Sequence, residues 1–458
     1  MKIHPELYQK YNKPTPRYTS YPPANYFKEV DDYTQIVEAI KASNNENPQN
    51  ISIYIHIPFC GQLCSYCGCN TLITSNKKLI STYVDTILKE IDLLKPLLDP
   101  NRKISQIHWG GGTPNFLPIT DIQKIMGKLY ANFDTIKQPE IAMECHPAHL
   151  TKEYVDGLVE LGFNRLSFGI QDFNEQVLEA VNRQKPLLPI DEIIAHIKSY
   201  PQVSLNLDFI YGLPFQNLKD YAKTIEQATE LSPDRLAVFS YAHVPWIKKQ
   251  QKSLEKFGLP TAEEKIALFE QAYDILTAKD YVPIGLDHFA KPEDELSKAL
   301  KTKQLHRNFQ GYCTLDTTGQ VYALGVSGIS QLHSAYLQNT KSITKYIKSI
   351  NKGVFPIERY YFVNQNEKII RDVIEQIMCN MYVDFKQVAG KYDLRVEEIY
   401  NLTKVDFRNI SEFQAEGLLN FADDVLELTR QGQFFMRNIA ASFDPNMKNN
   451  QKNFSKAL

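Results

Sequence analysis

Short runs rich in β-branched and aromatic residues alternate with helical patterns from residue 51 onward. The runs cover residues 52–57, 104–110, 140–145, 165–171, 204–212 and 235–241. Between the first two runs, apolar residues from Ile80 to Leu94 recur at spacings of three and four, which predicts a helix with one buried face. Further helices are predicted near 119–132, 151–161, 188–199 and 217–230. Repetition of strand and helix predicts parallel strands joined by right-handed crossovers, either in a doubly wound sheet or in an incomplete β/α barrel.

Polar and glycine residues at the ends of the runs favour the barrel. They are Tyr54 and His56, Gly110 to Gly112, Glu144, Gln171, Asp208, and Tyr241 with His243. A buried parallel strand otherwise prefers apolar residues, whereas barrel enzymes carry their reacting groups at the carboxyl ends of the strands. We therefore predict an α/β fold built on a partial (β/α)6 barrel.

The segments on either side of this core have a different character. Residues 1–50 are polar and contain several prolines, so we expect an arm too broken for a long helix. After about residue 356, apolar residues from Ile369 to Met381 mark an amphipathic helix. We predict an N-terminal arm (1–50), a catalytic core with an extension (51–355) and a mainly helical C-terminal lid domain (356–458).

The C-terminal segment resembles a winged helix in its order of elements. Helical turns are predicted near 386–400 and 411–419, followed by a hairpin over 418–429 with Asp423 and Asp424 at its tip. Winged helices often bind DNA, but residues 356–458 contain 13 Lys and Arg against 15 Asp and Glu. The basic surface that DNA binding requires is missing, so a lid or packing role is the better interpretation.

Charge and hydropathy restrict the cellular setting. The whole chain has a net charge of −2, which argues against a nucleic-acid or membrane-surface partner. No apolar stretch approaches the length of a membrane span, and the sequence starts without the apolar region of a secretory signal. We expect a cytoplasmic location and a monomer.

Four of the seven cysteines lie within ten residues, at Cys60, Cys64, Cys67 and Cys69. Thiolates suit zinc, copper or iron–sulfur centres. A structural zinc site normally uses two pairs of ligands, and no second pair follows here. Three thiolates on a cubane of four irons leave one iron free to bind a small molecule. An iron–sulfur cluster is therefore favoured over zinc or incidental cysteines.

The C-x3-C-x2-C spacing in IHIPFCGQLCSYCGCN resembles the radical S-adenosylmethionine superfamily. The resemblance implies that Cys60, Cys64 and Cys67 bind a 4Fe-4S cluster, whose open iron binds the amino and carboxylate groups of S-adenosylmethionine. The run His108 to Pro114, HWGGGTP, is similar to the superfamily's strand that binds the amino group.

Longer motifs resemble the oxygen-independent coproporphyrinogen III oxidase family over nearly the whole chain. They include PRYTSYP, CGCN, HWGGGTPNFL, GFNRLSFGIQDFN, DFIYGLP, LHRNFQGY and MRNIAASFD. This family uses two S-adenosylmethionine molecules. The resemblance implies that the cluster-bound molecule contacts Tyr54, Tyr66, Gly111, Glu144 and Ile329. It implies that the second contacts Gly112, Thr113, Gln171, Arg183, Asp208 and Ala242.

Several residues keep an alternative interpretation. Cys69 matches a further cysteine of the family, either as a catalytic thiol on the substrate side or as an ordinary buried cysteine. Gln171, Arg183 and Asp208 could each be a core hydrogen-bonding or surface group. Arg17 and Arg307 could steer the carboxylates of the substrate, because guanidinium groups pair bidentately with carboxylates.

The resemblance also implies the chemistry. An external donor of the flavodoxin or ferredoxin type reduces the cluster, which splits S-adenosylmethionine into methionine and a 5′-deoxyadenosyl radical. The radical removes a hydrogen from the β-carbon of a propionate, and loss of carbon dioxide and one electron leaves a vinyl group. Two such steps convert coproporphyrinogen III to protoporphyrinogen IX in haem biosynthesis.

Two rival functions remain open. A related branch of haem chaperones shares the cysteine loop, but Cys69 in CGCN, together with PRYTSYP and HRNFQGY, favours the oxidase. The second rival is a non-enzymatic zinc-binding structural or DNA-associated protein.

Overall fold

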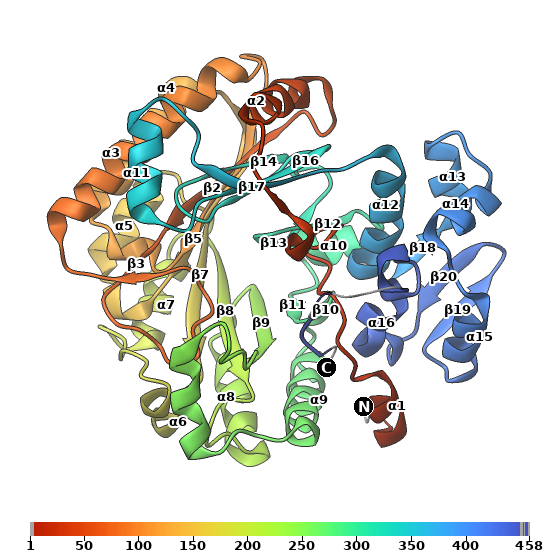
Figure 1. The fold of residues 1–458 in the computed structure, drawn as a ribbon. Helices are drawn as coiled ribbons and strands as arrows, with labels where there is room; N and C mark the ends of the chain where they lie inside the picture. The colour runs from red at the N-terminus through yellow and green to blue at the C-terminus, as the bar shows by residue number, and fades with distance from the viewer. Residues whose placement is uncertain (1–3, 449–451, 453, 457–458) are drawn as a thin grey trace. The chain divides into compact units, whose positions relative to one another are not determined.

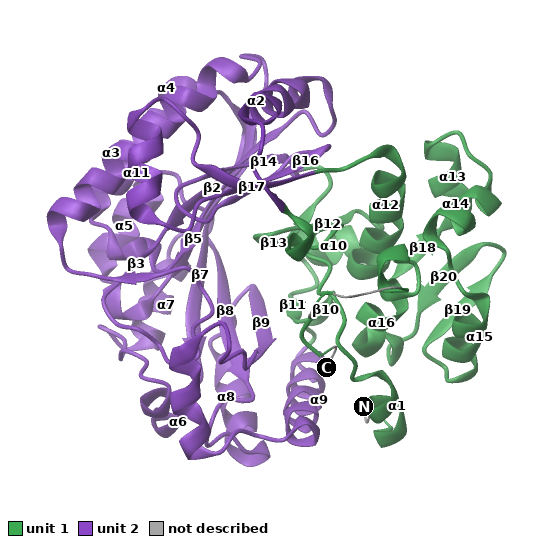
Figure 2. Ribbon diagram, viewed as in Figure 1, with its two compact units in different colours: residues 1–27, 280–316, 362–458 green, residues 28–279, 317–361 purple. Residues whose placement is uncertain are grey.

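The computed structural model describes residues 4–448, 452 and 454–456, which form two compact units (Figure 2). Unit 1 comprises residues 1–27, 280–316 and 362–458, and unit 2 comprises residues 28–279 and 317–361. Each unit is discontinuous in sequence, whereas the three predicted domains are consecutive segments. Because the two divisions differ in kind, the units do not test the boundaries 1–50, 51–355 and 356–458, which stay a prediction. Among the described residues, no helix combines the length and apolar character needed to cross a membrane.

Six parallel strands of unit 2 coincide with the six runs predicted from the sequence (Figure 1). They are β2 (Ile51–Ile57), β5 (Ile104–Gly111), β6 (Thr135–Cys145), β7 (Arg165–Gln171), β8 (Ser204–Tyr211) and β9 (Arg235–Ser240). They lie side by side in chain order, and β14 (Gln320–Leu324) adds a further parallel strand beside β2. The register places Tyr54 opposite His108, and Glu144 opposite Ser167. The predicted strand ends therefore meet along one edge.

The helices between these strands cover the outer face of the curved sheet (Figure 1). They are α3 (Lys77–Leu94), α4 (Ile119–Asn132), α5 (Lys152–Glu160), α7 (Ile190–Lys198) and α8 (Leu218–Glu230), all near their predicted positions. In α3 the apolar stripe from Ile80 to Leu94 is buried, and the Asn76 side chain caps the first turn by accepting from Leu79 N. The six-residue helix α6 (Glu175–Ala180) follows β7 and is too short to show a periodicity in the sequence.

A mainly antiparallel extension flanks β14 and was not predicted. Its strands are β15 (Ile329–Gln331), β16 (Ala335–Asn339), β17 (Ile357–Phe362) and β1 (Lys28–Glu29), in the order β14-β15-β16-β17-β1. The helix α11 (Ile343–Asn351) connects β16 to β17. Two helices, α1 (Pro5–Tyr11) and α2 (Tyr33–Ala42), lie within the segment predicted to be an arm, and neither is long.

Unit 1 contains the helices and hairpin predicted at the C-terminus. The predicted helices are α12 (Gln365–Asn380), α13 (Phe385–Lys391), α14 (Val396–Thr403) and α15 (Phe407–Ala415), whereas α16 (Met436–Ala441) was not predicted. The hairpin joins β19 (Leu419–Ala422) to β20 (Val425–Leu428), which also pairs with β18 (Tyr382–Asp384). Asp423 and Asp424 form its two-residue turn with φ of 53° and 63°, as a type I′ turn requires.

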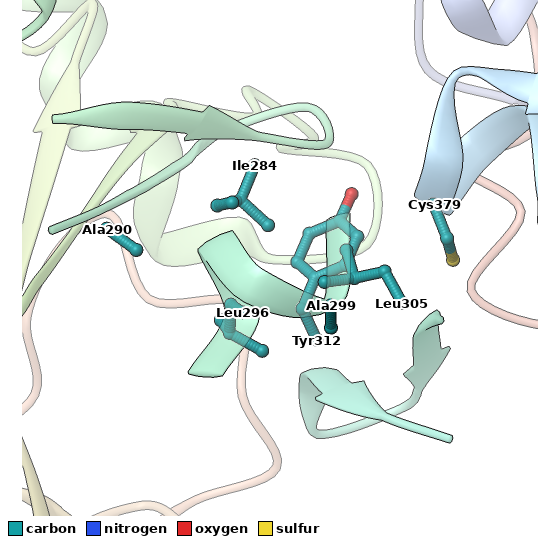
Figure 3. Packing of buried hydrophobic residues seen from close by; sticks show 7 residues of the cluster. All are labelled: Ile284, Ala290, Leu296, Ala299, Leu305, Tyr312 and Cys379. Atoms are coloured by element: carbon teal, nitrogen blue, oxygen red, sulfur yellow. The ribbon is translucent and has the colours of Figure 1, made fainter. Parts of the chain in front are cut away.

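A buried apolar cluster explains why residues 280–316 belong to unit 1 (Figure 3). Its members come from β10 (Val282–Ile284), β11 (His288–Ala290), α10 (Glu295–Lys301), β12 (Leu305–Asn308), β13 (Gly311–Thr314) and α12. Tyr312 and Leu305 pack here with Cys379 of α12, and Cys379 is fully buried. Burial of this apolar surface holds residues 280–316 onto α12.

Candidate active site

The cysteine loop follows the carboxyl end of β2 and is anchored on one side by the segment after α6. The short strand β3 (Phe59–Cys60) pairs with β4 (Leu72–Ile73), which closes the loop at its base. Ser65 N donates to the Val181 carbonyl oxygen over 2.8 Å. The Asn182 side-chain amide donates to the Leu63 carbonyl oxygen over 2.8 Å. These bonds fix the backbone that carries the three candidate ligands.

A second anchor comes from residues 248–251, which were not predicted to lie near the cysteine loop. Gln251 Nε2 donates to the Tyr66 carbonyl oxygen over 2.8 Å, and Gln250 Nε2 donates to that of Cys67 over 2.9 Å. Lys248 Nζ donates to the Cys69 carbonyl oxygen over 2.6 Å. Backbone carbonyls of an irregular loop need such partners, because an unpaired buried polar group is costly.

One cavity of about 170 Å³ brings most of the predicted site residues together. Of these residues, it is lined by Cys60, Cys64, Tyr66, Cys67, Cys69, Gly111, Gly112, Thr113, Glu144, Gln171, Arg183 and Asp208. The cavity is also lined by His146, Ser167 and Gly169, which were not predicted. Residues from five successive strands or their loops thus converge on one site, as the register of a parallel sheet predicts.

The glycine run lies where any side chain would collide with the site. A Cβ at Gly112 would lie 2.9 Å from Cys60 Sγ and 2.9 Å from the Pro58 carbonyl oxygen. A Cβ at Gly110 would lie 2.8 Å from Glu144 Oε1, and Gly111 has a φ of +123°. The run therefore lets the backbone approach the cysteine loop closely.

A row of hydrogen bonds and ring contacts orients Glu144. His108 Nε2 lies 3.1 Å from Glu144 Oε1, and the His108 ring stacks on Tyr54 with centroids 6.0 Å apart. The Tyr54 hydroxyl lies 3.1 Å from His56 Nδ1, and His56 Nε2 lies 3.0 Å from the Asn70 carbonyl oxygen. Burial lowers the pKa of His56, which keeps this interior histidine neutral. Tyr54 is not among the residues that line the cavity, and its role as a cofactor contact stays a prediction.

Arg183 lies between the cysteine loop and the strand β7. Its Nη1 lies 3.6 Å from Cys64 Sγ, and its Nη2 donates to the Gly169 carbonyl oxygen. The next strand contributes Asp208, which accepts from Ser167 Oγ and from the Asn206 side-chain amide over 2.8 and 2.7 Å. The arginine and the carboxylate face one cavity, so both ends of a zwitterionic ligand could find a partner here.

Besides Tyr54, two further predicted contacts do not line this cavity. Ala242 is exposed, and its carbonyl oxygen accepts from Gln251 Nε2 over 3.2 Å, so the same side chain joins it to Tyr66. Ile329 is half-buried at the start of β15, opposite Gln338 of β16. Both positions stay predictions as cofactor contacts.

The thiols differ in their electrostatic surroundings. Burial raises the pKa of Cys60 to about 11, although Thr113 Oγ1 lies 3.3 Å from its sulfur. A hydrogen bond with Cys69 lowers the pKa of Cys67 to about 6, and the same contact raises the pKa of Cys69. The Cys67 thiolate is therefore the readiest of these groups to bind a metal, because only thiolates coordinate metals well.

The donor set fits an iron–sulfur cluster. Cys60, Cys64 and Cys67 line a common cavity and supply three thiol groups to it. A four-iron cubane is larger than one ion, and its soft irons suit sulfur ligands. Arg183 and the glycine run line the same cavity beside the thiols.

Sequence comparisons agree with this geometry. The profile of the Radical SAM superfamily matches residues 54–228, and that of the HemN C-terminal domain matches residues 363–435. The oxygen-independent coproporphyrinogen III oxidase of Synechocystis sp. is 40% identical over 456 residues, which cover 99% of this chain and 97% of that protein. The chain belongs to the oxygen-independent coproporphyrinogen III oxidase family.

Other members of the oxygen-independent coproporphyrinogen III oxidase family match over similar lengths. The Escherichia coli protein of that name is 37% identical over 438 residues, covering 96% of this chain and 94% of its own length. The solved structure of coproporphyrinogen III oxidase (HemN) from Escherichia coli, described as a Radical SAM enzyme, superposes with a TM-score of 0.89. That match has 33% identity and covers 97% of this chain and 99% of the other. The radical SAM fold predicted from the sequence is confirmed.

Proposed function

We propose that this chain catalyses the oxygen-independent oxidative decarboxylation of coproporphyrinogen III to protoporphyrinogen IX. The observation that carries the proposal is the common cavity, in which Cys60, Cys64 and Cys67 face Glu144, Arg183 and the glycine run. Close relatives that span nearly the whole chain carry the name of this activity. The reaction belongs to haem biosynthesis, and we place it in the cytoplasm, in a monomer.

The three thiolates would hold the cluster and leave one iron open. When bound, a reduced 4Fe-4S cluster with S-adenosylmethionine supplies a 5′-deoxyadenosyl radical that can remove a hydrogen atom from the substrate. Glu144 would accept from the amino group of the cluster-bound S-adenosylmethionine, and His108 orients the Glu144 carboxylate. Tyr54 supports His108 from behind, and Tyr66, Gly111 and Ile329 complete the contacts.

Arg183 and Asp208 would hold a second S-adenosylmethionine at their side of the cavity. Arg183 would bind the carboxylate of its methionine moiety, and Asp208 its ammonium group. Further contacts come from Gly112, Thr113, Gln171 and Ala242. Two molecules match the need to decarboxylate two propionates, since each hydrogen abstraction consumes one radical.

Cys69 differs from the three ligands in position and exposure. Its side chain is exposed, although it contributes to the cavity wall. A fourth thiolate on the cluster would close the open iron, so we assign Cys69 to the substrate side.

Arg17 and Arg307 of unit 1 are proposed to attract the propionates. Arg17 Nη2 lies 3.2 Å from Asp287 Oδ2, and the Arg307 guanidinium lies 5.0 Å from the centre of the Tyr312 ring. Arg307 Nε is buried and has no hydrogen-bond partner among the described residues. A free N–H of a guanidinium is suited to a carboxylate.

The test is an anaerobic assay of the cluster-loaded protein with coproporphyrinogen III, S-adenosylmethionine and dithionite. We expect protoporphyrinogen IX, with two molecules of 5′-deoxyadenosine for each product molecule. Cys64→Ala should lose both the iron and the product, whereas Cys313→Ala, a buried cysteine of unit 1, should keep both. Deoxyadenosine without vinyl product would contradict the proposed substrate, and tight haem binding without decarboxylation would favour the chaperone.

A further inference from the structure

The segment between β9 and α9 (Ala262–Ala278) forms a 3₁₀ helix, η6 (Lys249–Phe257), with two exposed faces. A 3₁₀ helix has three residues per turn, so residues three apart share a face. Gln251 and Leu254 are 1% and 0% exposed and form the inward face. Lys249 and Lys252 share another face and are exposed, as is Lys256 on the remaining one.

The inward side of this segment is bonded directly to the cysteine loop. The side chains of Lys248, Gln250 and Gln251 donate to the carbonyl oxygens of Cys69, Cys67 and Tyr66, respectively. No other chain segment therefore lies between these side chains and the backbone of the candidate cluster ligand Cys67. Whatever binds the outer face of the segment is separated from the cluster site by one layer of protein.

The outer face presents an unusual apolar pair. Trp246 is 73% exposed and Ile247 is 68% exposed, which makes them the two most exposed large apolar side chains of the described residues. Single exposed apolar residues are common on protein surfaces. Here two adjacent residues are exposed, and one of them is a tryptophan, a residue type that is enriched at interaction hot spots. Trp246 and Ile247 are not needed to hold the cysteine loop in place, because their polar neighbours bond to its carbonyl oxygens.

Charge in the same segment has one dominant sign. Residues 246–257 contain four lysines and a single acid, Glu255. Glu255 Oε1 lies 3.0 Å from His243 Nε2, so it faces a partner within the chain. Lys249, Lys252 and Lys256 remain at the exposed surface, in a protein whose overall charge is −2. A local positive patch on a nearly neutral chain steers negatively charged partners.

We infer that residues 246–257 form the docking site of an acidic one-electron carrier protein that reduces the cluster. We call these residues the 246–257 surface. The inference rests on the proposed function, which needs an electron from outside the chain. One electron passes from the reduced carrier to the cluster, the carrier leaves oxidised by one electron, and no bond or proton is exchanged. Electron transfer weakens steeply with distance, so a surface bonded to the ligand loop is the favourable place for it.

The test compares two double variants of the cluster-loaded full-length protein that change the net charge equally. Lys249→Glu/Lys252→Glu reverses the 246–257 surface, and Lys219→Glu/Lys301→Glu reverses two exposed lysines at other places in the fold. A flavodoxin and a plant-type ferredoxin, both acidic, serve as probes. Kd is measured by biolayer interferometry, and reduction of the cluster by each carrier is followed by its visible absorbance in a stopped-flow instrument.

We expect the first variant to weaken the binding of at least one carrier by about tenfold or more and to slow cluster reduction at subsaturating carrier. Trp246→Ala should weaken binding by a similar factor at unchanged charge. Added salt should weaken wild-type binding and reduce the difference between the charge variants. The control variant should keep the wild-type Kd, and reduction by dithionite should stay unchanged in all variants.

Equal affinities of both double variants for both carriers would overturn the docking site. It would also be overturned if the 246–257 surface variants lost only self-association, or only binding to vesicles of anionic phosphatidylglycerol. Failure of the proposed function has a different signature. In that case dithionite-reduced wild-type protein makes no vinyl product, while the contrast in carrier affinity can still be measured.

Discussion

His108 Nε2 lies 3.1 Å from Glu144 Oε1, across the paired strands β5 and β6. The contact fixes one carboxylate oxygen and leaves the other for a ligand in the cavity. Glu144→Gln keeps the size of the side chain but removes its charge. We expect it to weaken S-adenosylmethionine binding by about tenfold to a hundredfold, because hydrogen bonds to charged groups contribute about 1.5–3 kcal/mol. Isothermal titration of the cluster-loaded protein measures this change.

The iron content of Glu144→Gln should equal that of the wild type, since Glu144 is not a cluster ligand. Glu160→Gln, an exposed position at the end of α5, is the matched control and should bind S-adenosylmethionine normally. Unchanged affinity in Glu144→Gln would remove this carboxylate from the cofactor site.

Gly112→Ala tests the close approach of backbone and cysteine loop. The added Cβ would lie 2.9 Å from Cys60 Sγ and 2.9 Å from the Pro58 backbone, so one of them must move. We expect less than half of the wild-type iron after anaerobic reconstitution, together with a lower Tm. Iron and sulfide assays and thermal unfolding measure the two effects.

Gly127→Ala is the control for this substitution. Gly127 lies within α4, and a Cβ there meets nothing within 4 Å. Alanine should stabilise the helix by up to about 1 kcal/mol through its higher helix propensity, with full iron content. If both variants load iron equally, the steric account of the glycine run is wrong.

Cys69→Ala distinguishes a substrate-side thiol from a fourth ligand. We expect four irons for each chain and normal S-adenosylmethionine binding, with formation of vinyl product reduced at least about tenfold. The expectation follows from the exposed position of Cys69 and from its absence from the C-x3-C-x2-C set. Loss of iron would show that Cys69 is a ligand, and full turnover would show that it has no catalytic part.

Glu90 of α3 gives a prediction about stability and pH. This fully buried carboxylate accepts from the Tyr346 hydroxyl over 2.6 Å, from Gly325 N over 2.8 Å and from Asn339 Nδ2 over 3.0 Å. These bonds pin the turn that precedes Ile329. Burial raises the pKa of Glu90 from 4.5 to about 7, so the folded protein holds this proton more tightly than the unfolded chain does.

The contribution of Glu90 to stability is therefore complete below its unfolded pKa and is lost as the pH rises to about 7. The free energy of unfolding should fall by up to about 3 kcal/mol over that window. Urea unfolding at pH 5, 6 and 7 measures the slope. Glu90→Gln cannot titrate and should remove this part of the slope; an unchanged slope would contradict the assignment.

Periodicity and strand-end chemistry predicted most of unit 2 and much of the site. The apolar stripe of α3 and the polar end of each parallel strand are local signals, because burial repeats along the chain. The row from Tyr54 to Glu144 follows from the register once the strands are parallel, as the sequence indicated. The Asp423–Asp424 turn could be predicted from equally local information, because aspartate tolerates the positive φ angles that this turn requires.

Other features depend on contacts between distant segments and leave no local pattern. The packing of Tyr312 against Cys379 makes unit 1 discontinuous, and neither segment shows this by itself. The mainly antiparallel extension around β14 is built from short strands, and most of these strands are not separated by a helix that would mark them in the sequence. Gln251 lies in a lysine-rich run whose composition is typical of a solvated loop. Its role as an anchor of the cysteine loop is shown only by its hydrogen bonds to Tyr66 and Ala242.

The central claim is a four-iron cluster held by Cys60, Cys64 and Cys67, with one iron open to S-adenosylmethionine. The most direct test is electron paramagnetic resonance and Mössbauer spectroscopy of anaerobically reconstituted, reduced protein, with and without S-adenosylmethionine. We predict one cubane of about four irons for each chain and a spectrum in which a single iron site changes when the molecule is added. A cubane that does not respond because a side chain ligates every iron, or zinc without iron and sulfide, would contradict the account.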